Sequence, residues 1–240
     1  QLQPYALIAK HLQKFVKNKD ANSLPTQELG AIAAMRDRQC VRAFLNQPVS
    51  NDTIIKTLDA AKFAPSGVNT QPWNVAIVGA NHQQKIASAI ISARENKIPD
   101  NPDYDYYPQE WVEPFKARRK ACGMALYGAL NIQIHETEKR KEQWYRNYHF
   151  FGAPVGFIFY IDSRLSMGAW IDFGMFIQNV MLAARAHGLE TCPQASLAEY
   201  PDIIREYLNI SPLYHIVCGM AVGYADWSAP VNQYRTTREE

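Results

Sequence analysis

The chain has 240 residues, 47% hydrophobic and 20% charged, a composition that suits one large domain with a core and excludes a disordered protein. Its formal net charge is +2 and no five consecutive residues carry like charge, so the charge pattern favours neither a nucleic acid nor a membrane as partner. Four widely spaced cysteines without a CxxC pair, and a first segment without the apolar run of a secretory signal, predict a cytoplasmic protein with reduced thiols.

Residues 1–35 are expected to form a helical extension to the main domain, residues 36–240. A first helix is indicated by apolar residues that share one face: Tyr5, Ile8, Leu12 and Phe15. Residues 18–25 form a polar break, and a second helix is predicted from residue 26 to about residue 36.

Ser50 is the predicted N-cap of the next helix. That helix should end near Phe63, because Pro65 disfavours a helical conformation in the residue before it. Its expected apolar side consists of Ile54, Ile55, Leu58 and Ala61. A loop, a short strand over residues 74–78 closed by Gly79, and a helix over residues 82–94 should follow.

Residues 95–114 are rich in tyrosine, proline and aspartate and show no periodicity. Long segments of this kind inside a compact domain often serve as lids or binding loops. Tyr104 to Trp111 are a candidate for such a lid, and a surface excursion or a contact between subunits is an equally good alternative. Two helices are predicted after it, over residues 114–130 and 138–148.

The run VGFIFYI, residues 155–161, is apolar throughout and should be a central strand buried on both faces. Ser166 then begins a long apolar helix that runs to about His187, with Gly188 as its C-terminal cap. Polar residues interrupt that helix, so a core helix is favoured over a membrane span. A short helix after Pro201 and a strand over residues 215–224 complete a predicted α+β fold.

The sequence lacks the motifs of several common classes of enzyme. There is no GxGxxG after a strand, and GxxxxGK[ST], HExxH and GxSxG do not occur. The six histidines show no metal-ligand spacing with one another or with the cysteines, so no metal is expected. If the protein is an enzyme, the difficult chemistry should belong to a cofactor that is held by other means.

Two arginine-bearing segments are candidates for an anion site. Arg38 and Arg42 lie in RDRQCVRAF, residues 36–44, and guanidinium groups make bidentate charge-assisted bonds to phosphate oxygens. An exposed basic turn is the alternative reading. Arg235 and Arg238 in the tail, NQYRTTREE, would join such a site only if the tail folds back beside the first pair.

The segment APSGVNTQPW, residues 64–73, combines stiffness with short polar groups. Its prolines restrict the backbone, and Gly67 permits close backbone approach. Trp73 should bury the segment against the core. Such a loop suits a flat heteroaromatic ring that needs several hydrogen bonds in its plane, although an ordinary structural loop is also compatible with this composition.

In order along the chain, six motifs resemble the nitroreductase family, and most closely bacterial nitroreductases of the nitrobenzoate-reductase kind. They are RDRQCVRAF (36–44), APSGVNTQPW (64–73), RNYHFFGAPVGFIFYID (146–162), GLETCPQASLAEYPD (188–202), CGMAVGYAD (218–226) and RTTR (235–238). The resemblance implies an FMN-binding flavoprotein with an α+β fold, built on a mixed and mainly antiparallel sheet flanked by helices. It also implies an intertwined homodimer with FMN at the subunit interface and with the long apolar helix in the dimer core.

The resemblance also implies a role for each matching position. Arg38, Gln39, Cys40, Arg42, Arg235 and Arg238 would hold the FMN phosphate and ribityl chain. Asn147 would contact the ribityl chain or the ring edge, and Pro193, Gln194, Ala195 and Ser196 would present backbone N–H groups to flavin N5. The loop that packs on the flavin from the partner subunit would be formed by Pro65, Ser66, Gly67, Asn69 and Gln71.

By the same resemblance, the protein would be an oxidoreductase that moves electrons from NADPH or NADH to a nitroaromatic or quinone by a ping-pong two-electron mechanism. No side chain is assigned a catalytic role, because flavin N5 carries the chemistry. The alternatives are ene reduction or reductive dehalogenation on the same scaffold, or a flavin-binding redox sensor without turnover. Cys40 stands where the family usually has serine, which puts a side-chain contact there in doubt.

Overall fold

A computed structural model describes residues 30–239 of the chain. The predicted first helix and the polar break after it lie outside the described residues. The predicted second helix is α2 (Ala31–Asp37), which begins after its N-cap Gly30, later than the predicted start at residue 26, because Gly30 has a non-helical backbone (φ −53°, ψ 145°). α2 ends where the arginine-bearing segment begins.

Four strands form the central sheet: β1 (Trp73–Gly79), β2 (Val155–Asp162), β3 (Glu190–Gln194) and β4 (Tyr214–Gly223). They lie in the order β1-β2-β4-β3, and each neighbouring pair is antiparallel. An isolated bridge between Cys40 and Thr191 adds one parallel pairing. The expected α+β fold with a mainly antiparallel sheet is therefore confirmed.

β3 is the strand that the sequence did not predict. It spans five residues, shows no alternation and contains Pro193, which cannot donate to a neighbouring strand. Proline is tolerated on edge strands, and β3 is the edge strand beside β4. Pro193 is therefore the residue that made this strand hard to recognise in the sequence, and the edge position of β3 is what allows a proline there.

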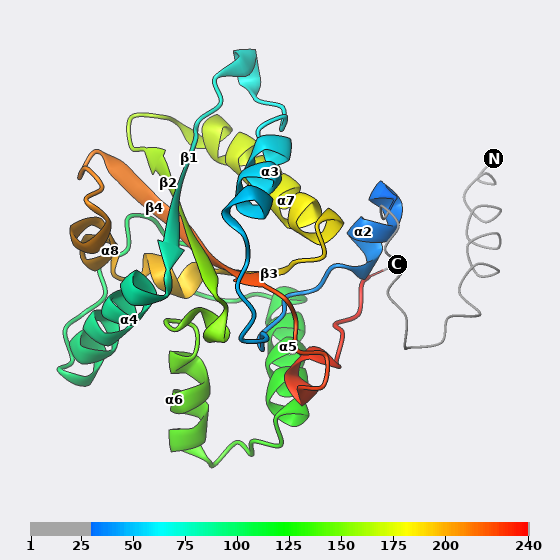
Figure 1. Cartoon of the computed structure of the whole chain (residues 1–240). Coiled ribbons are helices and arrows are strands. Elements are labelled where there is room, and N and C mark those ends of the chain that lie inside the picture. The colour runs from blue at the N-terminus through cyan, green and yellow to red at the C-terminus, as the bar shows by residue number, and fades with distance from the viewer. Residues whose placement is uncertain (1–29, 240) are drawn as a thin grey trace, which may run out of the picture.

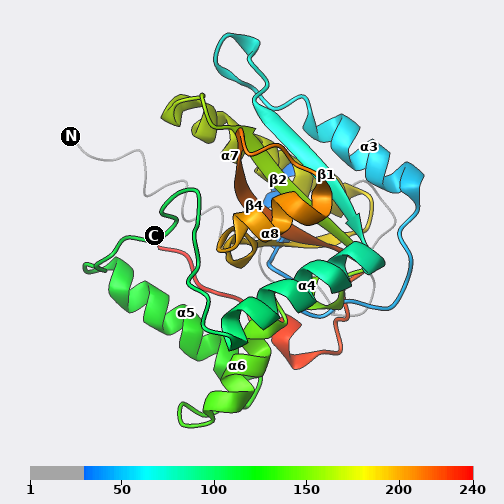
Figure 2. The same ribbon diagram turned by 90° about the vertical axis from the view of Figure 1, so that its left-hand side faces the viewer.

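β2 is a central strand, buried on both faces as predicted. Phe157 and Phe159 point into a core formed with α3 (Asn51–Ala61) and α7 (Met167–Ala186). The alternate residue Ile158 points into a second core, formed with α4 (Ala80–Glu95) and α8 (Pro201–Leu208). Figures 1 and 2 show these two helix layers on opposite faces of the sheet.

The helix ends follow the predicted capping chemistry. The Ser50 side chain accepts a hydrogen bond from the Thr53 N–H at 3.1 Å and caps α3. α7 is followed by Gly188, whose φ of +76° favours glycine. One expectation is wrong: Ile55 is 62% exposed, because the buried stripe of α3 runs through Ile54 and Thr57 instead.

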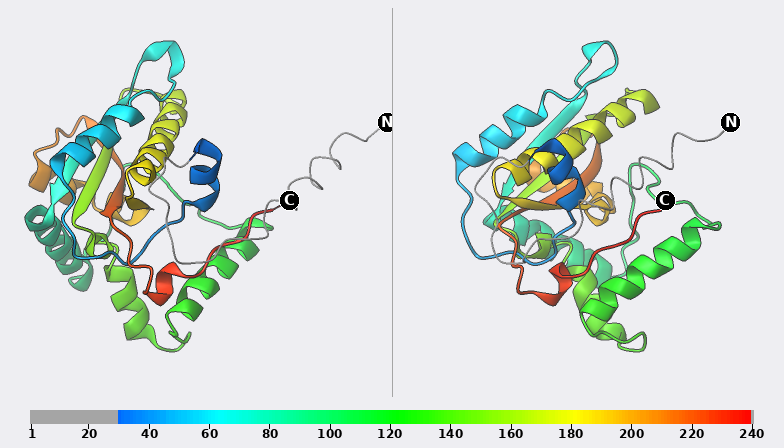
Figure 3. Two further views of the ribbon diagram at one scale, coloured as in Figure 1. Left: turned by 45° about the vertical axis from the view of Figure 1, so that its right-hand side comes forward. Right: turned by 90° about the vertical axis from the view of Figure 1, so that its right-hand side faces the viewer.

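α5 (Phe115–Ala129) and α6 (Thr137–Tyr145) form a hairpin that extends away from the sheet, and the C-terminal tail runs beside α5 (Figures 1 and 3). The segment between α4 and α5 contains no helix or strand, as predicted. Short 3-10 turns are η2 (Gly67–Asn69), η3 (Phe150–Gly152), η4 (Ala195–Ala198) and η5 (Pro230–Asn232). Within residues 30–239, no helix has the length and apolar character that crossing a membrane requires.

Candidate functional site

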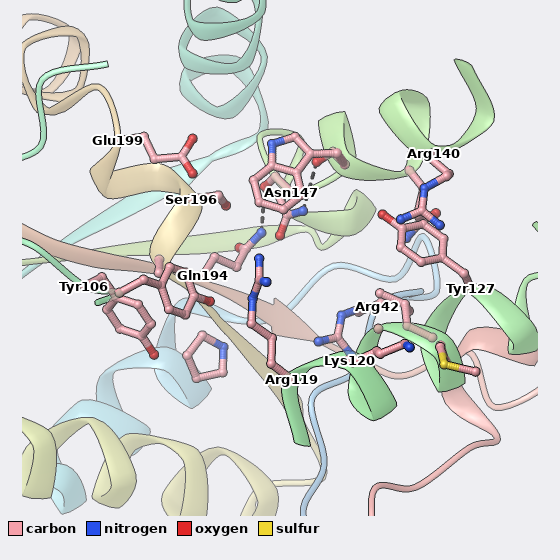
Figure 4. A pocket seen from close by; sticks show the side chains of 18 of the residues that line it. Arg42, Tyr106, Arg119, Lys120, Tyr127, Arg140, Asn147, Gln194, Ser196 and Glu199 are labelled. Atoms are coloured by element: carbon pink, nitrogen blue, oxygen red, sulfur yellow. Dashed lines mark hydrogen bonds between the residues drawn. The ribbon is translucent and has the colours of Figure 1, made fainter. Parts of the chain in front are cut away.

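Two cavities that share Arg42 lie between the end of β3 and the α5–α6 hairpin. The large cavity, of about 1340 Å³, is walled by the loop before α5, by both hairpin helices and by residues 193–199 (Figure 4). The arginine pocket, of about 540 Å³, is walled by the end of α2, the segment after it, Cys122 of α5 and the tail. Since Arg42 lines both, the two cavities are neighbours.

The arginine pocket collects cations from the two segments that the sequence singled out. No carboxylate is among the described residues that line it. Five arginines line it: Arg36, Arg38, Arg42, Arg235 and Arg238. Gln39 and Cys40 contribute to the same wall. Guanidinium groups recognise phosphate through paired charge-assisted hydrogen bonds, so the pocket suits a phosphate group.

Asn232 holds the tail against the first segment, and sequence reasoning missed it. It is buried, and its side-chain oxygen accepts a hydrogen bond from the Arg42 N–H at 2.8 Å. Its side-chain nitrogen donates to the Ala43 carbonyl at 2.8 Å. The Arg235 side chain in turn donates to the Arg38 carbonyl at 3.2 Å. These bonds produce the folded-back tail on which the anion site depends, and a single asparagine in an aperiodic tail gives no signal for it.

Cys40 lies at the junction of the arginine pocket and the sheet. It bridges to Thr191 of β3, and the following residue, Val41, donates its N–H to the Thr191 carbonyl at 3.1 Å. Hydrogen bonding by the Cys192 thiol and the positive charges of Arg42 and Arg38 lower the pKa of Cys40 below that of an ordinary cysteine, against the opposing effect of burial.

In protein without a bound ligand, alkylation of Cys40 by iodoacetamide should reach its midpoint at a lower pH than alkylation of an ordinary cysteine, because the pKa of Cys40 is lowered. An ordinary cysteine reaches this midpoint near about pH 8.5, because the thiolate is the nucleophile. The lowered pKa means that the Cys40 thiolate persists to a lower pH and is lost as the pH falls through that pKa. Peptide mass spectrometry of the labelled fraction against pH measures this, with Cys40→Ser as the labelling control. A midpoint near about pH 8.5 would contradict the lowered pKa.

The large cavity contains unpaired polar groups at the end of β3. Gln194 is buried, and its side-chain nitrogen donates to the Asn147 carbonyl at 2.6 Å. Its side-chain oxygen, like the Ser196 hydroxyl, has no hydrogen-bond partner among the described residues. Buried polar groups are normally paired, so these two are available to a ligand. Pro193, Ala195 and Asn147 line the same cavity, which suits a flat ring with a polar edge.

The loop before α5 forms one wall of the large cavity. Tyr104, Tyr106 and Tyr107 line it, and the Tyr104 hydroxyl donates to the Val217 carbonyl at 2.5 Å. The Tyr104 ring also packs on Trp170 at 4.6 Å. These contacts fix the start of the loop against the core, whereas Tyr106 and Tyr107 are more than half exposed. The loop therefore lies at the cavity, as either a lid or a contact between subunits requires.

The loop over residues 64–73 lines neither cavity. It projects from the end of α3 at the top of Figure 1, on the other side of the molecule from the α5–α6 hairpin. The Ser66 hydroxyl accepts the Gln71 N–H at 3.0 Å, and the Gly67 N–H donates to Asp172 of α7 at 3.0 Å. Pro65, Gly67, Asn69 and Gln71 are exposed. Trp73 stacks on Phe176 at 4.8 Å and holds the base of the loop, as predicted.

Basic residues of the hairpin form a cavity wall that the sequence interpretation missed. Lys116, Arg119 and Lys120 from α5 line the large cavity, together with Arg140 and Tyr127. The run KARRK, residues 116–120, was the available signal, but nothing in the sequence shows which surface a hairpin helix faces.

Comparison with known proteins agrees with this geometry. Residues 35–224 match the model of the Nitroreductase family. The chain is 38% identical over 217 residues to 4-nitrobenzoate reductase of Pseudomonas putida, which covers 90% of this chain and 94% of the relative. It is also 38% identical over 208 residues to nitrobenzene nitroreductase of Ectopseudomonas oleovorans, covering 86% and 91%.

Solved structures share the whole described fold. The FMN- and NADPH-dependent nitroreductase NfnB of Sphigopyxis sp. strain HMH is 35% identical, with a TM-score of 0.84 over 88% of this chain and 96% of that chain. The FMN-dependent nitroreductase NfnB of Mycobacterium smegmatis, solved in complex with NADPH, is 31% identical, with a TM-score of 0.83 over 88% and 94%.

Proposed function

The chain belongs to the nitroreductase family, and we infer that it is an FMN-dependent oxidoreductase that uses NADPH or NADH to reduce nitroaromatic compounds. The observation that carries this inference is the pair of neighbouring cavities on either side of Arg42, because one suits a phosphate and the other suits a flat ring with a polar edge. FMN has both parts in one molecule.

Each end of the site has its own task. Arg38, Arg42, Arg235 and Arg238 would neutralise the phosphate and fix its position. Gln194, Ser196 and the backbone around Ala195 would hold the ring edge and stabilise charge on it. When bound, FMN would supply the redox chemistry, taking a hydride from the nicotinamide and passing two electrons to the acceptor. The tyrosine-bearing loop would exclude water from that reaction.

We expect the working form to be a homodimer with FMN at the subunit interface. The loop over residues 64–73 is exposed and far from the cavities of its own subunit, so it is free to cover those of a partner. α7 packs against α2 and α3, as Figure 3 shows. α7 exposes Met167 and Ile171, and Phe63, just after α3, is also exposed. Large exposed apolar side chains of this kind are typical of an interface.

The names of the relatives support a class of acceptor, the nitroaromatic compounds, but differ in the charge of that acceptor. One relative is named for a nitroarene with a carboxylate, and the other for uncharged nitrobenzene. These names support a nitroaromatic acceptor and leave its charge open. Quinones share the electron-poor ring, and we include them as second acceptors. Because both substrates would use the same large cavity, we propose that they bind in turn, in a ping-pong cycle.

The test is anaerobic stopped flow on the FMN-loaded protein. NADPH should bleach the yellow colour, and a nitroaromatic or quinone should restore it over many cycles. Double-reciprocal plots at several acceptor concentrations should be parallel. A protein that stays colourless with added FMN would contradict the function. Halide release from a halophenol with negligible nitroarene turnover would instead favour reductive dehalogenation, and bleaching without repeated recolouring would favour a sensor.

A further inference from the structure

Three cations of α5 extend the large cavity beyond the places assigned to FMN. Lys116, Arg119 and Lys120 line this cavity and not the arginine pocket. Figure 4 shows Arg119 reaching from α5 toward Asn147 and Gln194, with Lys120 and Arg42 beside it. Within residues 30–239, none of the three forms an ion pair or a side-chain hydrogen bond. The same cavity wall contains Asp100, Asp105 and Glu199, of which Glu199 is paired with Arg94.

We propose that Arg119 and Lys120 bind the acid group of an aromatic acceptor, so that a nitroarene carrying a carboxylate is the preferred substrate class. This inference rests on the proposed nitroreductase function and goes beyond it, because it assigns a negative charge to the acceptor and names the residues that would bind the charged group.

The surroundings of Arg119 fit an aromatic acid. Its guanidinium lies over the Trp111 ring at 5.2 Å, which supports the side chain, and Arg119 also lines the cavity. Tyr106, Tyr107 and Tyr127 line the same cavity and offer apolar faces to a ring. Cations beside aromatic side chains match a ligand that is aromatic along its length and negative at one end.

Other anions fit this place less well. The FMN phosphate already has the arginine pocket, whose cations come from other segments. The 2′-phosphate of NADPH lies a dinucleotide's length from the reacting nicotinamide, whereas Arg119 reaches toward Gln194, beside the expected ring edge. The acid group of a small nitroarene lies only one ring away from its nitro group, which agrees with that position.

The experiment compares two acceptors of the same size, 4-nitrobenzoate and its uncharged analogue 4-nitrobenzamide, on the FMN-loaded protein. Wild type should have a kcat/KM about tenfold or more in favour of the acid, and Arg119→Gln with Lys120→Gln should reduce this ratio by about tenfold to a hundredfold, mainly through KM. Arg118→Gln is the matched control, because Arg118 is ion-paired with Glu239 at 2.9 Å and does not line the cavity. That control should keep the wild-type ratio.

Binding of unreactive benzoate, followed by isothermal titration calorimetry on the same holoproteins, gives a readout that is independent of turnover. Its dissociation constant should rise in the double variant by a similar factor. An unchanged acid-to-amide ratio would overturn the proposal, as would a change confined to the ratio of NADPH to NADH or to FMN affinity. Absence of turnover with both acceptors would contradict the proposed function instead, and the benzoate titration would still decide the anion subsite.

Discussion

Replacing Arg42 with glutamine should lower the affinity of the protein for FMN by at least about 100-fold. Each charge-assisted hydrogen bond contributes about 1.5–3 kcal/mol, and a guanidinium can make two of them to one phosphate. Arg42 lines both cavities, and its side chain is held by the Tyr234 hydroxyl at 3.3 Å and the Cys40 carbonyl at 3.4 Å. It is therefore already positioned before the ligand arrives.

Fluorescence titration of FMN-free protein measures the dissociation constant, and the flavin-to-protein ratio after gel filtration gives a second readout. Arg164→Gln is the matched control, because Arg164 is exposed, bonds locally to Asp162 and lines neither cavity. The melting temperature of both FMN-free variants separates lost binding from lost folding. If Arg42→Gln binds FMN within about threefold of wild type, the arginine pocket is not the phosphate site.

Ile171→Glu should convert the dimer into monomers and strip it of FMN. Ile171 is 67% exposed on the outer side of α7, in the face expected to meet the partner. A twofold interface would bury both copies of the new carboxylate, and an unpaired charge in apolar surroundings costs several kcal/mol. Loss of the partner would also remove the loop over residues 64–73 from the flavin site that we propose it covers.

Sedimentation equilibrium should show wild type at twice the chain mass of 27.3 kDa and the variant at 27.3 kDa. Ile98→Glu is the control, since Ile98 is 55% exposed but follows α4, on the opposite face of the sheet. A variant that remains dimeric and keeps its FMN would place the interface elsewhere.

The sequence predicted those parts of the fold that depend on local chemistry. Pattern and capping residues identified the buried strand 155–161, the Ser50 cap and the long helix ending at Gly188, because each is determined by neighbours along the chain. The short edge strand β3 was missed, since five residues with a proline carry no periodic signal. Only its pairing with β4 makes it a strand.

The candidate site depended more heavily on contacts between distant segments. The arginines could be named from the sequence, but their convergence depends on Asn232, whose bonds to Arg42 and Ala43 span about 190 positions. The basic wall of α5 was not predicted, because its orientation is set by an aperiodic loop and by packing beside the tail. The exposed loop over residues 64–73 lines neither cavity of its own subunit, so its proposed role at the flavin requires a second copy of the chain.

A mixed dimer tests most directly whether two copies build one flavin site. One subunit carries Arg42→Gln, the other carries Ser66→Ala with Asn69→Ala, and two affinity tags isolate the heterodimer. If the loop acts on the partner's flavin, one site collects both defects and the other is intact, so the heterodimer should bind about one FMN and keep about half of the wild-type activity. Each homodimer should bind FMN weakly. A heterodimer without FMN and without activity would contradict the shared site, because it would show that the loop and the arginines of one subunit serve the same flavin.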